Sequence, residues 1–146
     1  MEKKVAKLKT KFTQLVVIKK KEVQKSEKEI QQKNIDLQKA KESLKMAYNS
    51  LHEVANPSNG SISQLLASRS LLQTARVQIK HNQEWVEFAQ DQLKNAKDQL
   101  KKDMIEYEKY KYIELQEIKK KLKEIKLAEA KELDEIALMT FNKKEK

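Results

Sequence analysis

The chain of 146 residues is strongly charged and poor in aromatic residues: charged side chains make up 37% of it, aromatic side chains 5%, and the formal net charge is +10. This composition is typical of long solvated helices and argues against a thick globular core. The absence of cysteine excludes disulfides, thiolate metal sites and a cysteine nucleophile, and a single glycine excludes a glycine-rich phosphate loop. We therefore expect no enzyme, no cofactor and no metal site.

The first predicted helix covers residues 1–55. A heptad count from Val54 back to Val5 finds apolar residues at eleven of fifteen positions, which indicates one face that packs against another helix. Residues 1–24 carry eight lysines and two glutamates, a net charge of +6. The apolar run LVVI in this helix is too short for a signal peptide or a membrane span, and with the lack of cysteine it favours the cytoplasm.

The predicted turn covers residues 56–63. Its stretch NPSNG holds the only proline and the only glycine of the chain. Pro57 disfavours helical geometry at the residue before it and so ends the first helix, and the Asn-Gly pair tolerates the positive φ of a chain reversal. Ser61 and Gln64 then form the pattern of a capping box, which starts a new helix.

The second predicted helix covers residues 64–141 and is followed by a tail at 142–146. From Leu72 to Leu100 the heptad positions include one polar residue, Asn82. Beyond Leu100 we expect a stutter, a local shift of the heptad phase, because two successive steps of four separate the apolar residues. The positions after this shift are Met104, Tyr107, Lys111, Leu115, Ile118, Leu122 and Ile125.

The sequence therefore predicts an all-α fold in which two long helices form a single antiparallel coiled-coil hairpin with unequal arms. If pairing starts at the turn, residues near 5 face residues near 113, and the second arm lacks a partner in its own chain from about residue 118. An apolar stripe without an internal partner predicts oligomerisation or docking. In this overhang the apolar residues are Ile118, Leu122, Ile125, Leu133, Ile136 and Phe141.

Four large apolar residues fall away from the helix–helix interface in this register. They form a candidate docking surface, and the alternative interpretation is scattered exposure without a role: Met46, Val77, Trp85 and Phe88. A nucleic-acid interface is disfavoured because lysines alternate with glutamates and the chain has two arginines. His52 and His81 have no cysteine or organised carboxylates to join them, so we interpret both as surface residues.

Several features together carry a family resemblance. They are a basic N-terminal helix, a break with Asn59-Gly60, the long run EYEKYKYIELQEIKKKLKEIK, and the ending AKELDEIALMTF. In that ending, Asp134-Glu135 followed by Ile136 and Ala137 is similar to the C-terminal Asp-Glu pattern of the family. Over nearly its whole length the sequence resembles the FliJ proteins of the bacterial flagellar type III export apparatus.

The resemblance implies a soluble cytoplasmic component that is peripherally associated with the membrane export apparatus. Such a component binds the export ATPase ring in the manner of the central stalk of rotary ATP synthases. The resemblance further implies contact with the cytoplasmic domain of the export gate and handling of substrate chaperones.

The termini of an antiparallel hairpin lie at the same end, so the basic N-terminal segment and the overhang are expected to meet there. Charge would steer that end to the ATPase ring and apolar contact would anchor it. The expected ATPase-binding residues are Lys3, Lys4, Lys7, Lys11, Ile118, Leu122, Ile125, Leu133, Asp134, Glu135 and Ile136. The export gate is expected to bind Met46, Val77, Trp85 and Phe88.

Three alternatives remain open. Stalk proteins of injectisome secretion systems share this architecture. A plain structural coiled coil would use the overhang to associate with itself, so a dimer is the alternative to the expected monomer. A nucleic-acid binder would lose affinity steeply with added salt.

Overall fold

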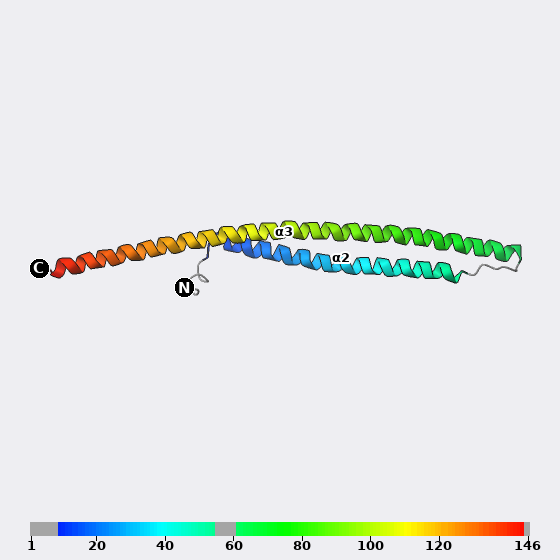
Figure 1. Ribbon diagram of the computed structural model, residues 1–146, viewed down its shortest axis with the longest axis horizontal. Helices are drawn as coiled ribbons and strands as arrows, with labels where there is room; N and C mark the ends of the chain where they lie inside the picture. The colour runs from blue at the N-terminus through cyan, green and yellow to red at the C-terminus, as the bar shows by residue number, and fades with distance from the viewer. Residues whose placement is uncertain (1–8, 55–60, 145–146) are drawn as a thin grey trace. The chain divides into compact units, whose positions relative to one another are not determined.

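The computed structural model describes residues 9–54 and 61–144 and shows two helices (Figure 1). Helix α2 spans Thr13–Glu53, with 41 residues, and helix α3 spans Ile62–Lys144, with 83 residues. No strand occurs in the described ranges, so the all-α prediction is confirmed. The predictions for Lys3, Lys4, Lys7 and residues 55–60 lie outside these ranges.

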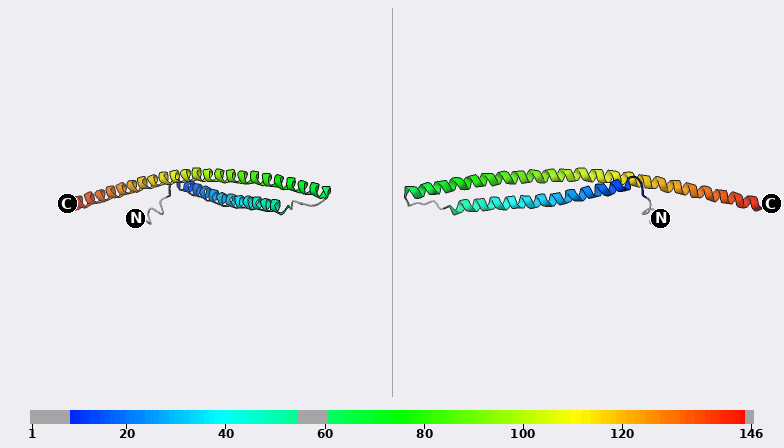
Figure 2. Two further views of the ribbon diagram at one scale, coloured as in Figure 1. Left: turned by 45° about the vertical axis from the view of Figure 1, so that its right-hand side comes forward. Right: turned by 180° about the vertical axis from the view of Figure 1, so that it is seen from behind.

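The chain divides into two compact units. The tip unit is Gln24–Lys102, and the terminal unit combines the chain up to Val23 with Asp103–Lys146. In each unit a part of α2 lies alongside a part of α3 in every view (Figure 1; Figure 2). The two helices run antiparallel in both units, as the contacts below establish.

Both helices start at hydroxyl caps. Before α2, the backbone N–H of Thr10 donates to the hydroxyl of Thr13, 2.9 Å away, and the N–H of Phe12 donates to the hydroxyl of Thr10. This local network accounts for the start of α2 at residue 13, whereas the sequence predicted helix through the described residues 9–12 as well. Before α3, the hydroxyl of Ser61 accepts a hydrogen bond from the N–H of Gln64 at 3.3 Å, which confirms the hydroxyl half of the predicted capping box.

The core of the tip unit consists of small and branched residues at the predicted heptad positions. Leu37 and Ala40 of α2 pack with Ala89 and Leu93 of α3, and Ala40 is fully buried. Further buried positions on the same faces are Ala47, Ala75, Ile79 and Ala96. Alanines have no bulk beyond Cβ, so the two helices can approach closely along this face.

Asn82, the one polar residue of its heptad run, is buried in the tip unit and fully bonded. Its side-chain oxygen accepts a hydrogen bond from the hydroxyl of Ser43 on α2 at 2.7 Å, and its amide donates to the carbonyl of Gln78 at 2.8 Å. A bonded polar residue at such a position fixes which residues lie opposite each other. Nearby, Gln83 donates to the hydroxyl of Tyr48 at 2.8 Å.

The predicted pairing of the two helices was wrong by several residues. In the terminal unit the hydroxyl of Thr13 donates to Glu114 at 3.5 Å, whereas pairing from the turn would place residues near 5 opposite residues near 113. The cause lies in the tip unit, where residues 62–67 at the start of α3 are all exposed. Pairing begins instead where Val54 and Leu71 line the same hollow, and this register sets Asn82 opposite Ser43.

The positions predicted after Leu100 are confirmed only in part: Ile118 is buried and Tyr107 and Leu122 are half-buried, but the others are exposed. Met104 and Leu115 are 47% and 46% exposed, and Lys111 is exposed as well. An unshifted heptad count from Leu100 also falls on less exposed positions, beside the buried Ile118: Asp103, Tyr107, Tyr110, Glu114, Glu117 and Lys121. Two polar contacts join α2 to these positions of α3. The ammonium of Lys19 lies 5.6 Å from the centre of the Tyr110 ring, and the hydroxyl of Thr13 donates a hydrogen bond to Glu114.

The overhang therefore begins later than predicted. Ile118 is buried, with 8% of its surface exposed, and Leu122 is half-buried. Lys121 donates to the backbone carbonyl of Lys9 at 3.1 Å, so the described chain still covers α3 at this point. From residue 123 to residue 143 every side chain is exposed. The shift of register accounts for this difference, because it moves the end of α2 further along α3.

Candidate partner-binding surfaces

Nothing in the described ranges resembles a metal centre, since no group of three or more histidine, cysteine or acidic residues there could hold an ion. His52 and His81 are both exposed, which confirms their interpretation as surface residues. None of the described helical segments is long and apolar enough to cross a membrane. The surfaces of interest are therefore the exposed apolar ones.

The overhang, residues 123–143, presents apolar side chains on two opposite sides of α3. One side carries Ile125, Ile136 and Met139, and the other carries residues with the same spacing, displaced by two positions: Leu127, Leu138 and Phe141. Two residues correspond to about 200° of helix rotation, so the two sets point in opposite directions. A helix that is apolar on both sides fits a partner that surrounds it.

Sequence reasoning identified one part of this surface. Ile125, Leu133 and Ile136 are exposed as predicted, and Asp134 and Glu135 lie exposed between them. Ile118 and Leu122 belong to the covered interface instead. On the second side the sequence prediction included Phe141 but not Leu127 and Leu138, although the spacing of eleven and then three residues repeats there.

The described part of the basic N-terminal segment contacts α3 just before this overhang. Lys9 is bonded through its carbonyl to Lys121, two residues before the overhang starts. Lys11 is exposed, and its ammonium lies 5.2 Å from the centre of the Phe12 ring. The terminal unit thus joins lysines of the N-terminal segment to an exposed apolar helix.

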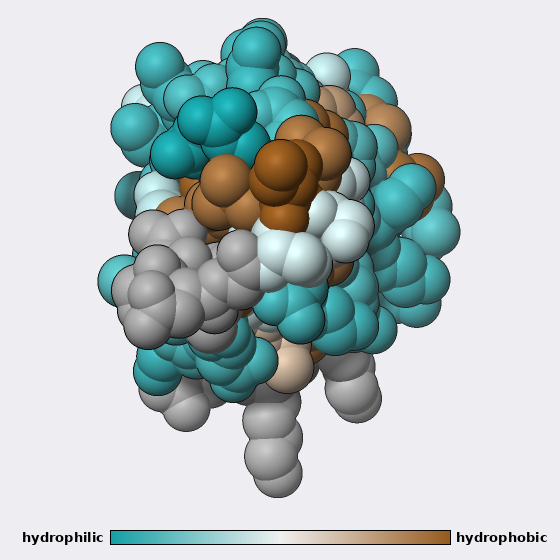
Figure 3. All heavy atoms as spheres, turned by 90° about the vertical axis from the view of Figure 1, so that its right-hand side faces the viewer, coloured by the Kyte–Doolittle hydropathy of each residue, from teal (hydrophilic) through white to brown (hydrophobic). Residues whose placement is uncertain are grey.

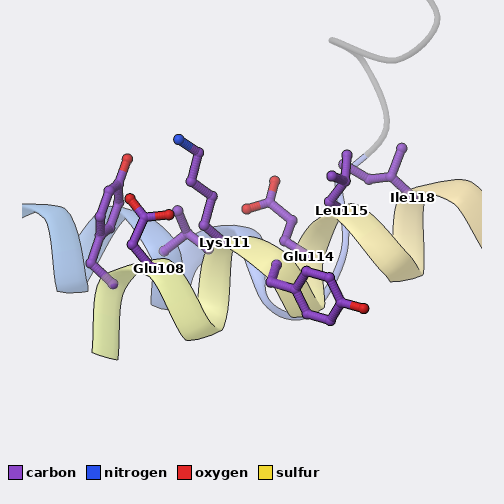
Figure 4. A pocket seen from close by; sticks show the side chains of 8 residues that line it. Glu108, Lys111, Glu114, Leu115 and Ile118 are labelled. Atoms are coloured by element: carbon purple, nitrogen blue, oxygen red, sulfur yellow. The ribbon is translucent and has the colours of Figure 1, made fainter. Parts of the chain in front are cut away.

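A groove in the terminal unit runs between α2 and α3. It has a volume of about 410 Å³, with Val16 of α2 and Leu115 and Ile118 of α3 among its lining residues. Figure 4 shows Glu108, Lys111 and Glu114 projecting side by side from α3 along this groove. The lining is thus apolar with both charge signs at the margin, a composition suited to a protein partner rather than to a small ligand.

A second hollow of about 500 Å³ continues along α3 and shares Glu108 and Tyr112 with the groove. Its apolar residues Met104, Ile105 and Tyr112 are 47%, 66% and 63% exposed. Sequence reasoning missed this surface, because the predicted stutter placed Met104 and Leu115 in the helix–helix interface.

The four residues expected to bind the export gate are all exposed: Met46 69%, Val77 54%, Trp85 41% and Phe88 61%. Trp85 and Phe88 line one hollow of about 250 Å³ together with Lys33, Asp36 and Lys39 of α2. Val77 lies eleven residues before Phe88 and therefore on the same side of α3.

Met46 lines a different hollow of the tip unit, together with Val54 and Leu71. The structure thus brings Trp85 and Phe88 together, places Val77 on their side of α3, and sets Met46 apart.

Comparison with known protein families gives a match over nearly the whole sequence. The family described as flagellar FliJ protein matches residues 8–146. Comparison with curated proteins and with solved structures finds no match. The family match covers both helices and both units, including the overhang and the exposed residues of the tip unit. The chain therefore belongs to the flagellar FliJ protein family and is a component of the flagellar export apparatus.

Proposed function

We propose that this protein binds the export ATPase ring as a central stalk and connects it to the export gate and to substrate chaperones. It acts without catalysis of its own, as a cytoplasmic protein that associates peripherally with the membrane apparatus. The observation that carries the proposal is the overhang, residues 123–143, which is exposed throughout and apolar on two opposite sides.

The two-sided overhang favours a surrounding partner for an energetic reason. Burying a large apolar side chain stabilises a complex by about 1.5–3 kcal/mol. If the overhang paired with a single further helix, that helix would bury one side, for example Ile125, Ile136 and Met139. Leu138 and Phe141 on the other side would stay in water. A ring lumen can cover both sides at once. The same argument disfavours the alternative of a plain self-associating coiled coil.

The charge distribution also supports the proposal that the terminal unit is the part of the protein that enters the ring. Residues 1–24 carry a net charge of +6. The described part of this segment contacts α3 through the hydrogen bond between Lys9 and Lys121, two residues before the overhang. Steering by the lysines, including Lys3, Lys4 and Lys7, would raise the rate of encounter, and apolar contacts would set the lifetime of the complex.

We assign binding of the export gate to the exposed apolar residues of the tip unit. Trp85 and Phe88 provide the aromatic anchors that are enriched at the centres of protein interfaces. Lys33, Asp36 and Lys39 surround them and provide polar contacts at the margin. An injectisome stalk would use the same surfaces, and the family match to flagellar proteins favours the flagellar system.

Deletion of residues 124–146 tests the proposal. The deletion removes exposed helix and spares Ile118 and Leu122, so the remaining chain should keep its helical content and its melting temperature. Binding to a purified flagellar export ATPase, measured by isothermal titration calorimetry, should be lost. Undiminished binding by the shortened chain would show that the overhang is not the ATPase-binding segment.

A further inference from the structure

The start of α3 differs in charge from the rest of the molecule. From residue 54 to residue 83 the sequence contains no aspartate or glutamate, although the chain has 22 acidic residues. The same stretch holds both arginines of the chain, Arg69 and Arg76, and also Lys80. This segment is purely cationic within a chain whose other helical segments mix the two signs.

The first turns of α3 in this segment are not covered by α2. Residues 62–67 are all exposed, and Ile62, Leu65 and Leu66 are 78%, 48% and 59% exposed. Figure 3 looks at the tip unit from the side on which α3 begins and shows apolar side chains, in brown, at the surface. Helix α3 thus offers its first turns to a partner outside the two-helix core.

The apolar and cationic residues follow one side of α3 with a regular repeat. Every member of this set, which we call the arginine stripe, is exposed: Ile62, Leu66, Arg69, Gln73, Arg76 and Lys80. Successive members are alternately four and three residues apart, which is the spacing of a coiled-coil interface. The interface with α2 uses a different set, which includes Ala75, Ile79 and Asn82. α3 therefore presents a second, exposed face with heptad spacing beside the face that packs against α2.

The arginines of this stripe are available for a partner. Across the described residues no carboxylate pairs with either guanidinium, and the nearest acidic residues in the sequence are Glu53 and Glu84. Arginine differs from lysine because its planar fork binds a carboxylate through two parallel hydrogen bonds. The two arginines are seven residues apart, about 10.5 Å along the helix axis, so they match two carboxylates with the same spacing on a second helix.

We propose that the arginine stripe binds an acidic amphipathic helix of a partner protein, with the apolar side of that helix on Ile62 and Leu66. Two of its carboxylates, seven residues apart, would pair with Arg69 and Arg76. This surface is distinct from the ATPase-binding overhang and from the hollow of Trp85 and Phe88, and the inference does not depend on those assignments.

The arrangement of the stripe favours a protein over a membrane surface. A helix that lies on a lipid bilayer separates its apolar side from its charged side, so that the apolar side can enter the hydrocarbon. Here Arg69 and Arg76 lie in line with Ile62 and Leu66, so insertion of the stripe would carry the guanidinium groups into the hydrocarbon as well. An acidic helix satisfies both kinds of residue at once.

The experiment uses the full-length protein and a designed probe. The probe is a fluorescently labelled 21-residue helical peptide with leucine at heptad positions a and d and glutamate at e and g. A second peptide carries glutamine in place of each glutamate. Binding is measured by fluorescence anisotropy for the unaltered protein and for the double variant R69E/R76E. The matched control is K94E/K101E, which changes the same number of charges at the same spacing on exposed positions of α3.

The proposal predicts that the acidic peptide binds the unaltered protein and that R69E/R76E weakens binding at least about tenfold. K94E/K101E should change binding less than about twofold, the glutamine peptide should bind weakly, and circular dichroism should show unchanged helicity for both variants. Equal losses in both double variants would overturn the proposal, because they would show attraction to net charge alone.

Two further measurements distinguish other occupants. Arginine-dependent sedimentation with phosphatidylglycerol vesicles would assign the stripe to a membrane and overturn the proposal. Self-association of the protein that R69E/R76E abolishes, measured by analytical ultracentrifugation, would assign the stripe to a second copy of this chain and overturn the proposal as well. A protein that stays monomeric and does not sediment with the vesicles would support the proposed binding of an acidic partner helix.

Discussion

At the scale of single residues, Asn82 determines much of the geometry. It lies in a row of small and apolar side chains, where a polar group costs free energy unless it is hydrogen-bonded. Ser43 provides the cross-helix bond at 2.7 Å and Gln78 the bond within α3. The pair therefore favours the observed alignment of the two helices over alignments shifted along the interface.

Replacing Ser43 with alanine should destabilise the protein by about 1–3 kcal/mol, because the buried amide oxygen of Asn82 loses its partner across the interface. Urea unfolding followed by circular dichroism measures this difference in the free energy of unfolding. The matched control is Ser50→Ala, also on α2 but exposed, which should stay within about 0.5 kcal/mol. A Ser43→Ala variant as stable as the control would mean that the bond does not contribute.

Trp85 and Phe88 test the assignment of the export gate. Because they are 41% and 61% exposed, alanine at either position should lower the melting temperature little. Binding to the purified cytoplasmic domain of the export gate should weaken by about tenfold or more, as for aromatic anchors at interface centres. The neighbouring exposed Glu87→Ala serves as control. A large loss of stability without a specific loss of binding would make these two residues part of the folded core.

At the scale of helices, the heptad pattern identified the faces that meet but not the residues that lie opposite each other. All the described heptad positions from Phe12 to Val54 are at least half-buried, as predicted. The alignment was missed because periodicity repeats every seven residues and is equally satisfied by shifted pairings. The contact of Ser43 with Asn82 depends on atoms of both helices, which a single-helix pattern does not contain.

The phase of α3 after Leu100 was predicted only in part. Ile118 and Leu122 lie in the interface as predicted, but Met104 and Leu115 are exposed. Tyr110, Glu114 and Lys121 lie in the interface although they were not predicted there. Each of these makes a specific contact with α2 or with the chain before it. Lys19 lies over the ring of Tyr110, Thr13 donates a hydrogen bond to Glu114, and Lys121 donates one to the carbonyl of Lys9. Exposed apolar residues in this region mark surfaces for other proteins, which a rule of apolar burial overlooks.

The two sides of the overhang make a prediction at the same scale. Two variants remove one side each: I136S/M139S on the first side and L138S/F141S on the second. Because a surrounding ring contacts both sides, each variant should weaken ATPase binding by at least about tenfold, with unchanged melting temperature.

Calorimetric titration of the purified export ATPase provides the measurement, with the exposed Lys126→Ala as control. Loss of binding in one variant and full binding in the other would indicate docking on a single side, against the account of an enclosed stalk.

At the scale of the whole molecule, the proposed partner surfaces are distributed over both units. The terminal unit carries the basic segment and the two-sided overhang, and the tip unit carries the aromatic hollow and the arginine stripe. The family match places such a molecule in the flagellar export apparatus. Among the described residues few are buried, and no large side chain there is fully buried, so much of the described apolar surface is exposed.

The sequence predicted the fold and these exposed surfaces in part. Composition and periodicity were sufficient for the all-α fold, for the exposed Trp85 and Phe88, and for an unpartnered C-terminal segment. The second side of the overhang and the arginine stripe emerged when burial was known, because exposure depends on where α2 ends along α3.

The most direct measurement is the ATP hydrolysis rate of a purified flagellar export ATPase as the full-length protein is titrated in, with the mass of the mixture determined in parallel. The stalk account predicts a rising hydrolysis rate and the appearance of a complex of ring size that contains this protein. An unchanged rate, no complex, and a stable dimer of this protein by mass would contradict it.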